Sequence, residues 1–172
     1  MLGGILAYNY HQKIFGKAIT KDSELFIYST DSLEDIKEKI SGFSKSPNTF
    51  LWVAEKKNFS KLKTGRYLLK EGMSNNDLVN ILRIGDQTAV KVSFNNQDTL
   101  EKFASRIAEQ LQIDSTEILN SFRDKSFLKE HNLTKKSAFQ ICIPNSYQFY
   151  WNVSADSFRN KLLSEYNKFW NA

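Results

Sequence analysis

The sequence has little of what disulfide-stabilised proteins and metalloenzymes usually carry. Its 172 residues include one cysteine, two histidines, seven glycines and two prolines. A single cysteine excludes an internal disulfide. Cys142 lies in an apolar run without a nearby histidine, which favours a buried structural thiol over a nucleophile. No group of histidines and cysteines has the spacing of zinc ligands.

Other signatures of catalysis are missing as well. No glycine-rich phosphate-binding loop occurs, and His11 and His131 each stand alone in polar surroundings. Carboxylates are numerous, but they fall on helix faces expected to be solvated, so no pair can be singled out as a glycosidase acid and base. The sequence therefore predicts no catalytic residue, no metal site and no cofactor.

The charge is mildly positive and evenly spread. Lysine and arginine outnumber aspartate and glutamate by 24 to 19, a net charge of +5. Basic and acidic residues alternate along the helical segments, as in 34–39, which is typical of solvated faces. The aromatic residues fall on core faces and not between basic residues, so a nucleic-acid partner is not expected. An anionic envelope or membrane surface suits this charge.

The N-terminal run, residues 1–8, is apolar but far shorter than the roughly 20 residues that cross a bilayer. Tyr8, Tyr10 and Lys13 fit the aromatic and basic residues that collect where a helix leaves a membrane. The pattern predicts that residues 1–20 are a membrane-proximal segment at the end of a transmembrane anchor. A frayed terminus or the remnant of a signal segment is the alternative.

The remainder has the composition of a folded α+β protein, with 41% hydrophobic and 13% aromatic residues. Residues 24–28 and 64–69 read as strands, and two helices lie between them, near 33–40 and from Pro47 to Asn58. This order predicts a βααβ unit with adjacent antiparallel strands and both helices on one face. The expected buried residues are Phe26, Leu33, Ile36, Ile40, Leu51 and Leu68.

Further along, helices dominate. Ser74 caps a helix that ends at Gly85, and residues 87–94 alternate as a strand with one solvated face. Helices are expected at 98–112, 114–123, 125–131 and 154–170, whereas Pro144 argues against a helix within 138–153. These elements predict a mostly helical second part with short strands.

The βααβ unit has the shape of a LysM-like module, in which two loops form a shallow groove suited to sugars that bear amide groups. Ser29, Thr30 and Asp31 fall on the first loop, and Arg66 and Tyr67 lie at the end of the second. Backbone amides and an aromatic wall would recognise N-acetyl groups there. Ordinary loops of a small α+β core are the alternative.

One long segment resembles a known family. Residues 65–85, GRYLLKEGMSNNDLVNILRIG, resemble the G-x-Y-x-(hydrophobic)-x-x-G-M-S-N-x-(acidic) signature, with its following aliphatic residues and final glycine, of the endolytic murein transglycosylase or YceG-like family. Residues 90–94 and 99–108 resemble the strand and helix of that family's second domain. Pro144, Asn145, Ser146 and Tyr147 resemble its P-D-T-Y turn, with Asn145 in place of aspartate.

The resemblance implies a membrane helix, a LysM-like subdomain over 21–86 and the first part of a transglycosylase domain over 87–172. In this family one glutamate cuts nascent glycan strands and leaves 1,6-anhydro ends, without a cofactor. That glutamate follows the P-D-T-Y turn, in a pattern like L-A-S-I-(aliphatic)-E-x-E, which does not occur here. Glu109 precedes the turn and is not expected to take the role, so these residues by themselves are expected to be inactive.

The expected function is that of the peptidoglycan recognition and positioning part of a lytic murein transglycosylase, single-pass in the bacterial inner membrane, with the folded part extracytoplasmic. A non-catalytic glycan-binding or scaffolding module of the cell envelope is the alternative. Expected partners are glycan strands, the membrane and cell-wall synthesis proteins. The expected substrate-binding residues are Ser29, Thr30, Asp31, Arg66, Tyr67, Asn145, Ser146 and Tyr147.

Overall fold

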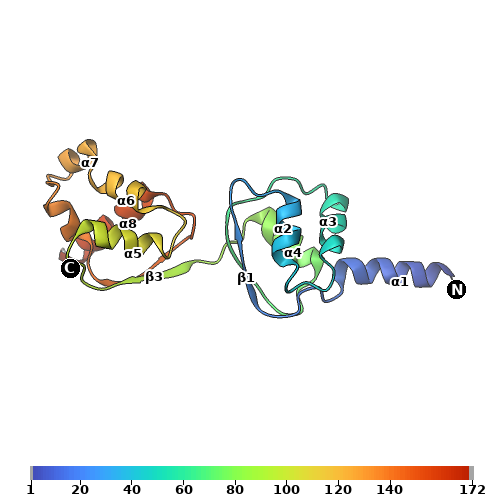
Figure 1. The fold of residues 1–172 in the computed structure, drawn as a ribbon. Coiled ribbons are helices and arrows are strands. Elements are labelled where there is room, and N and C mark those ends of the chain that lie inside the picture. Colours follow the sequence, from blue (N-terminus) through green and yellow to red (C-terminus); the bar gives the residue numbers. More distant parts are fainter. Residues whose placement is uncertain (1, 171–172) are drawn as a thin grey trace. The chain divides into compact units, whose positions relative to one another are not determined.

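The computed structural model describes residues 2–170. The chain divides into two compact units, Met1–Thr88 (unit 1) and Ala89–Ala172 (unit 2), each with its own two-stranded sheet and its own hydrophobic core (Figure 1). Helices and short antiparallel strands make up both units, so the predicted α+β class is confirmed.

Unit 1 begins with a helix and then forms the predicted βααβ order. β1 and β2 pair antiparallel, with Leu25 opposite Tyr67 and Ile27 opposite Gly65. The prediction of two adjacent antiparallel strands joined through two helices is therefore confirmed. The elements are α1 (Leu2–Phe15), β1 (Ser23–Ile27), α2 (Leu33–Ile40), α3 (Pro47–Lys56), β2 (Gly65–Leu69) and α4 (Asn75–Ile84).

The termini of α4 follow the signals in the sequence. Ser74 is the N-cap: its hydroxyl accepts a hydrogen bond from the backbone N–H of Asp77, and the Asp77 carboxylate accepts from the backbone N–H of Ser74 at 3.0 Å. This reciprocal pair satisfies two helix N–H groups that would otherwise lack partners. Gly85 ends the helix in the left-handed conformation, at φ 79°. A residue without Cβ adopts this conformation without steric strain.

The buried face of the sheet differs from the prediction. Leu25, Ile27 and Leu69 are 0–2% exposed, whereas Phe26 and Leu68 are only half-buried. Apolar residues occupy both faces of each strand, so the sequence pattern does not decide which face is buried. A shift of one residue exchanges the two faces. Ile36 and Ile40 are buried as predicted, but Leu33 and Leu51 are half-buried at the edge of the core.

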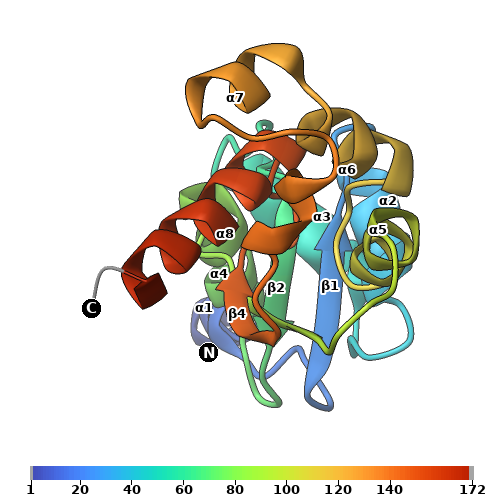
Figure 2. The ribbon, with the colours of Figure 1, turned by 90° about the vertical axis from the view of Figure 1, so that its left-hand side faces the viewer.

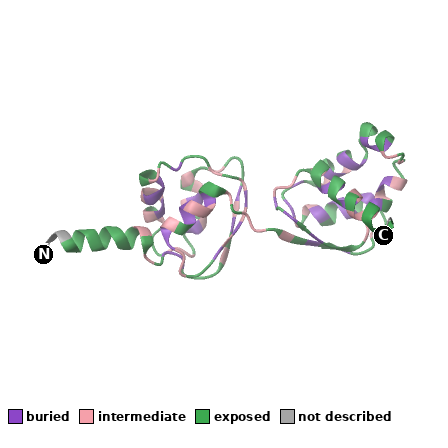
Figure 3. Ribbon diagram, turned by 180° about the vertical axis from the view of Figure 1, so that it is seen from behind, coloured by how far each residue is buried: buried purple, intermediate pink, exposed green. Residues whose placement is uncertain are grey.

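Helix α1 extends away from the rest of unit 1, and most of it is exposed (Figures 1 and 3). Its C-terminal part is the part that packs: Tyr10 contacts Trp52 edge-on with ring centroids 5.2 Å apart, and the Asn75 side chain donates to the Lys13 carbonyl oxygen at 3.2 Å. Within residues 2–170, no helix combines the length and apolar character needed to cross a bilayer.

Unit 2 pairs β3 with β4 antiparallel, so that Val92 lies opposite Tyr147. The pair lies at one side of the unit and α7 at the other, as Figures 1 and 2 both show. The elements are β3 (Val90–Phe94), α5 (Leu100–Ala108), α6 (Ser115–Phe122), α7 (Lys125–Glu130), the 3-10 helix η1 (Ser137–Ile141), β4 (Asn145–Phe149) and α8 (Ala155–Trp170).

The sequence analysis missed β4, because Pro144 excluded a helix without indicating a strand. In β4 the side chains of Tyr147 and Phe149 are buried, while their neighbours are exposed. Helix α5 is also shorter than the predicted 98–112. After it ends, the side chain of Gln110 bonds the backbone N–H of Ser93 at 3.0 Å, which ties this turn to β3.

Aromatic rings fill the core of unit 2. Phe103 is fully buried at its centre, and its ring lies 4.8–6.2 Å, between centroids, from four other phenylalanine rings. These partners come from β3, α6, η1 and α8, namely Phe94, Phe122, Phe139 and Phe158. One side chain thus joins elements separated by more than 60 residues, and its burial stabilises the unit strongly.

Candidate functional site

Asp31 organises the loop between β1 and α2. Its carboxylate accepts a hydrogen bond from the backbone N–H of Tyr28 at 2.7 Å and pairs with the ammonium group of Lys39. That ammonium group also donates to the carbonyl oxygen of Phe26 at 3.0 Å. The Asp31 side chain is only 11% exposed. The carboxylate of Asp31, which was predicted to bind sugar, thus already has hydrogen-bond and ion-pair partners within the protein. These contacts shape the loop.

The start of α2 fixes the other end of this loop. The Ser32 backbone N–H and hydroxyl both donate to the Asp35 carboxylate, at 2.7 and 2.6 Å. These hydrogen bonds from Ser32 lower the pKa of Asp35. A short loop held at both ends presents its side chains at defined positions, which a recognition surface requires.

A second segment faces this loop across a hollow of about 670 Å³. The predicted residues Ser29 and Asp31 line it, together with Thr64 just before β2. Thr30 belongs to the same loop and is exposed, but it is not among the lining residues. The other lining residues are Tyr28, Ser32, Leu33, Glu34, Ser60, Lys61 and Leu62. The two predicted loops therefore meet at one hollow.

Tyr28 supplies the aromatic surface of this hollow. Its side chain is 43% exposed, and the Lys39 ammonium group lies 4.9 Å from the centroid of its ring. Because that ammonium group also pairs with Asp31, it links the ring to the loop. The sequence analysis treated Tyr28 as the last residue of a strand. Its position directly before Ser29 was the signal that could have assigned it to the site.

Arg66 and Tyr67 do not line the hollow. Tyr67 is fully buried, and its hydroxyl donates to the carbonyl oxygen of Lys63 at 2.8 Å. Arg66 is paired with Glu24 across the sheet, where its Nη2 lies 2.5 Å from a carboxylate oxygen, and this pair lowers the pKa of Glu24. The structure thus places Tyr67 in the core, where its ring has no free face for a sugar.

The expected site residues of unit 2 are also divided between surface and core. Asn145 and Ser146 are exposed and line a shallow hollow of about 520 Å³ with Arg106, and the Ser146 hydroxyl lies 2.8 Å from that of Ser93. Tyr147 is 8% exposed, its hydroxyl donates to the Ile143 carbonyl oxygen at 2.7 Å, and burial raises its pKa. Tyr147 belongs to the core of unit 2.

Several acidic side chains of the described residues take part in hydrogen bonds or ion pairs that stabilise their charged form. Wherever a shift in a carboxyl pKa is resolved within residues 2–170, it is downward and comes mainly from hydrogen bonds, as in Asp77 and Glu165. A general acid needs the opposite shift. Glu109 is exposed and pairs with Arg106 at 2.8 Å. In the same part of the chain, no three side chains of histidine, cysteine, aspartate or glutamate are arranged to hold a metal ion.

A family model and a solved structure both match the chain. A search of curated proteins found no match to the chain. A solved structure of a YceG-like protein from Listeria monocytogenes is 19% identical, with a TM-score of 0.48 over 87% of this chain. The chain spans 55% of the length of that protein. The model of the YceG-like family matches residues 25–172, most of both units, and the chain therefore belongs to the YceG-like family.

Proposed function

We propose that unit 1 binds the amide-bearing sugars of peptidoglycan in the hollow between the β1–α2 loop and the segment before β2. The chain would thereby be the part of a lytic murein transglycosylase that recognises and positions glycan strands. The observation that supports this most is that hollow, which is lined by hydroxyl-bearing residues of both segments and by the exposed Tyr28. The order of strands and helices in the sequence predicts a groove between the same two segments.

The chemistry of the walls favours a neutral sugar. Hydroxyl groups of Ser29, Ser60 and Thr64 can exchange hydrogen bonds with sugar hydroxyls and amides, and Leu62 offers an apolar contact to an acetyl methyl group. The charged lining residues have mixed signs, since two carboxylates accompany one lysine. A site for phosphate would need an excess of cations. Binding through hydrogen bonds and stacking should therefore depend little on salt.

The proposal extends to the membrane and to cleavage. Helix α1 exposes apolar and aromatic side chains, including Ile5 and Tyr8, and we assign it to the surface of the bacterial inner membrane with both units outside the cytoplasm. The family resemblance assigns the cleavage that leaves 1,6-anhydro ends to one glutamate. None of the described carboxylates is proposed for that role, because the family's glutamate follows the P-D-T-Y turn in a pattern that does not occur in this sequence.

A non-catalytic role is the second candidate. A module that binds glycan and contacts cell-wall synthesis proteins would need the hollow of unit 1 but no general acid. The paired, exposed state of Glu109 is the observation that favours it. Both candidates expect no cleavage by these 172 residues alone, so 1,6-anhydro ends detected by mass spectrometry after incubation of the purified chain with uncrosslinked glycan strands would contradict both.

Binding itself is tested by titrating the labelled protein with chitotetraose and following backbone amide signals. Signals of Tyr28, Ser29 and Thr64 should shift together, and Tyr28→Ala should weaken binding about tenfold or more, as expected for loss of a stacking contact worth about 1.5 kcal/mol. Tyr150→Ala removes another exposed tyrosine, in unit 2, and is the matched control. Equal losses in both variants would reject the assignment of Tyr28.

A further inference from the structure

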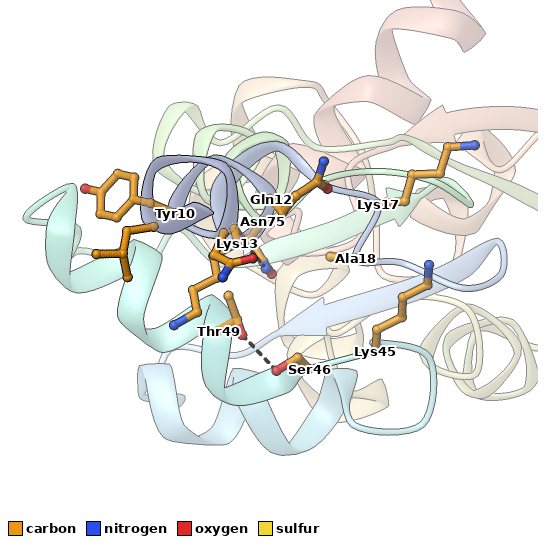
Figure 4. A pocket seen from close by; sticks show the side chains of 12 residues that line it. Tyr10, Gln12, Lys13, Lys17, Ala18, Lys45, Ser46, Thr49 and Asn75 are labelled. Carbon is orange, nitrogen blue, oxygen red and sulfur yellow. Dashed lines mark hydrogen bonds between the residues drawn. The ribbon is translucent and has the colours of Figure 1, made fainter. Parts of the chain in front are cut away.

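A pocket that the proposed function does not use lies at the C-terminal end of α1. It has a volume of about 720 Å³ and lies where α1 meets the start of α3 and the first residue of α4 (Figure 4). Leu6 borders it on α1, and Asn75 of α4 is part of its wall. Unit 1 contributes all of its lining, so its geometry depends on that unit alone.

The pocket is cationic. Lys13, Lys17 and Lys45 line it, and no aspartate or glutamate is among the lining residues. The side chains of Lys17 and Lys45 come from different segments but extend to the same side of the pocket (Figure 4). Among the ion pairs of the described residues, none uses these two ammonium groups. Two such groups on one rim favour an anionic ligand.

The interior of the pocket offers hydrogen-bonding groups. The hydroxyls of Ser46 and Thr49 lie 2.8 Å apart, one bonded to the other, and only one of them can donate in that bond. Asn75 is 4% exposed and donates through its amide nitrogen to Lys13, but its Oδ1 has no hydrogen-bond partner within the described part of the chain. A buried amide oxygen without a partner is destabilising, and a ligand that brings a hydroxyl donor would relieve this.

The exposed apolar residues of α1 beside the pocket indicate the kind of ligand. α1 leaves unit 1 directly beside it and exposes Ile5, Leu6 and Tyr8, which are 61–66% exposed. An apolar helix beside a cluster of lysines is the arrangement that binds the interface of an anionic membrane. Acyl chains would cover the helix while a headgroup at the same depth enters the pocket.

We propose that this pocket binds the headgroup of an anionic phospholipid that carries free hydroxyl groups, of the phosphatidylglycerol type. Lys17 and Lys45 pair with the phosphate, Lys13 adds to the positive potential, and a headgroup hydroxyl donates to Asn75 Oδ1. The site would fix the depth and rotation of unit 1 at the bilayer, and so the direction in which its glycan hollow opens. The inference rests on the proposed membrane attachment of α1.

Vesicle sedimentation tests the proposal with the whole chain. Binding to vesicles with phosphatidylglycerol should exceed binding to vesicles of pure phosphatidylcholine, and Lys17→Gln/Lys45→Gln should weaken the former about 25-fold, or about fivefold per lysine. Lys91→Gln/Lys129→Gln removes the same charge from exposed positions of unit 2 and should change binding less than about threefold. Equal losses in the two double variants would overturn the site.

The headgroup is then distinguished from charge alone. Phosphatidic acid carries the phosphate without the glycerol hydroxyls, so phosphatidylglycerol should bind more tightly at matched vesicle charge, and Asn75→Leu should remove this preference. If inorganic phosphate at millimolar concentration shifts the amide signals of Ser46 and Thr49 as strongly as glycerol 3-phosphate does, the site is one for free phosphate and the lipid assignment fails.

The failure of this inference and that of the proposed function give different results. Equal binding to both neutral and anionic vesicles would keep membrane attachment through α1 and reject the headgroup site. No binding to any vesicle would reject the attachment and the site together. Loss of chitotetraose binding in Tyr28→Ala concerns the other hollow, and the lysine variants should leave that binding unchanged.

Discussion

The hydroxyl group of Tyr67 donates a hydrogen bond to the carbonyl oxygen of Lys63, four residues earlier, at 2.8 Å. Tyr147 makes the corresponding bond to Ile143 in unit 2, at 2.7 Å. In both units a buried tyrosine within a strand thus holds the segment that leads into that strand. The bond in unit 1 anchors the stretch before Thr64, which forms one wall of the candidate glycan hollow.

Replacing Tyr67 by phenylalanine should reduce the stability of the protein and leave glycan recognition in place. Tyr67→Phe keeps the buried ring and removes one hydrogen bond, so the free energy of unfolding should fall by about 0.5–1.5 kcal/mol. Tyr67→Ala also leaves a cavity and should cost about 3–5 kcal/mol. Urea unfolding followed by circular dichroism measures both. A large loss of chitotetraose binding in folded Tyr67→Phe would contradict this prediction and show that recognition depends on the hydroxyl.

Gly65 should not tolerate a side chain. Its φ is +147°, and a Cβ at this position would overlap atoms of the Gln87 side chain. The flexible end of Gln87 can move, but the backbone strain remains, so Gly65→Ala should destabilise the protein by about 1–3 kcal/mol. Gly42→Ala is the control, since a Cβ added there would have no neighbour within 4 Å and the φ of Gly42 is not in the left-handed range. Similar midpoints of thermal unfolding for the two variants would contradict the prediction.

The N-cap of α4 should make unit 1 sensitive to acid. Hydrogen bonding by Ser74 lowers the pKa of Asp77 below its ordinary value of 3.8. The charged carboxylate therefore stabilises the fold fully above about pH 4, and this contribution is lost as the pH falls through the lowered pKa of the folded state. Asp77→Asn should reduce stability at pH 7 and flatten the dependence of unfolding free energy on pH below about 4.

Asp35 caps α2 in the same way, so the double variant Asp35→Asn/Asp77→Asn should flatten the acid dependence further. Unfolding followed from about pH 2.5 to pH 7 measures the effect. An unchanged slope at the acid end in the double variant would show that these two caps do not contribute to it.

The chain by itself should not cleave glycan. Residues 103–109 have a passing likeness to the family's catalytic pattern, yet Glu109 is exposed and paired with Arg106. A general acid contributes about 10²–10⁴ to the rate, so without one no 1,6-anhydro ends should be detected by mass spectrometry. Products that form with the purified chain and disappear in Glu109→Gln would assign the chemistry to Glu109.

The sequence predicted the secondary-structure elements better than it predicted which face of each element is buried. Caps such as Ser74 and stops such as Gly85 are local signals, and the elements that they bound are present. The choice between Leu25 and Phe26 as the buried residue is not local, because both faces of β1 are apolar and the packing of the helices decides between them. β4 was missed because its partner β3 lies about 50 residues earlier in the chain.

The candidate site was predicted in the same uneven way. The two loops follow from the order of the elements, and they do meet at one hollow. The side chains on them depend on strand phase, and the error of one residue in β2 that exchanged Leu68 for Leu69 also put Tyr67 on the wrong side. Tyr28, directly after β1, is instead the exposed aromatic residue of the hollow.

The measurement that tests the central proposal most directly is a chitotetraose titration of the labelled chain at low and at moderate salt. The account predicts that amide signals of residues 28–32 and 60–64 shift with one dissociation constant, that this constant changes less than about twofold between about 20 and about 200 mM salt, and that Tyr28→Ala raises it. Shifts confined to other residues, or binding lost at the higher salt, would contradict the assignment of this hollow to glycan.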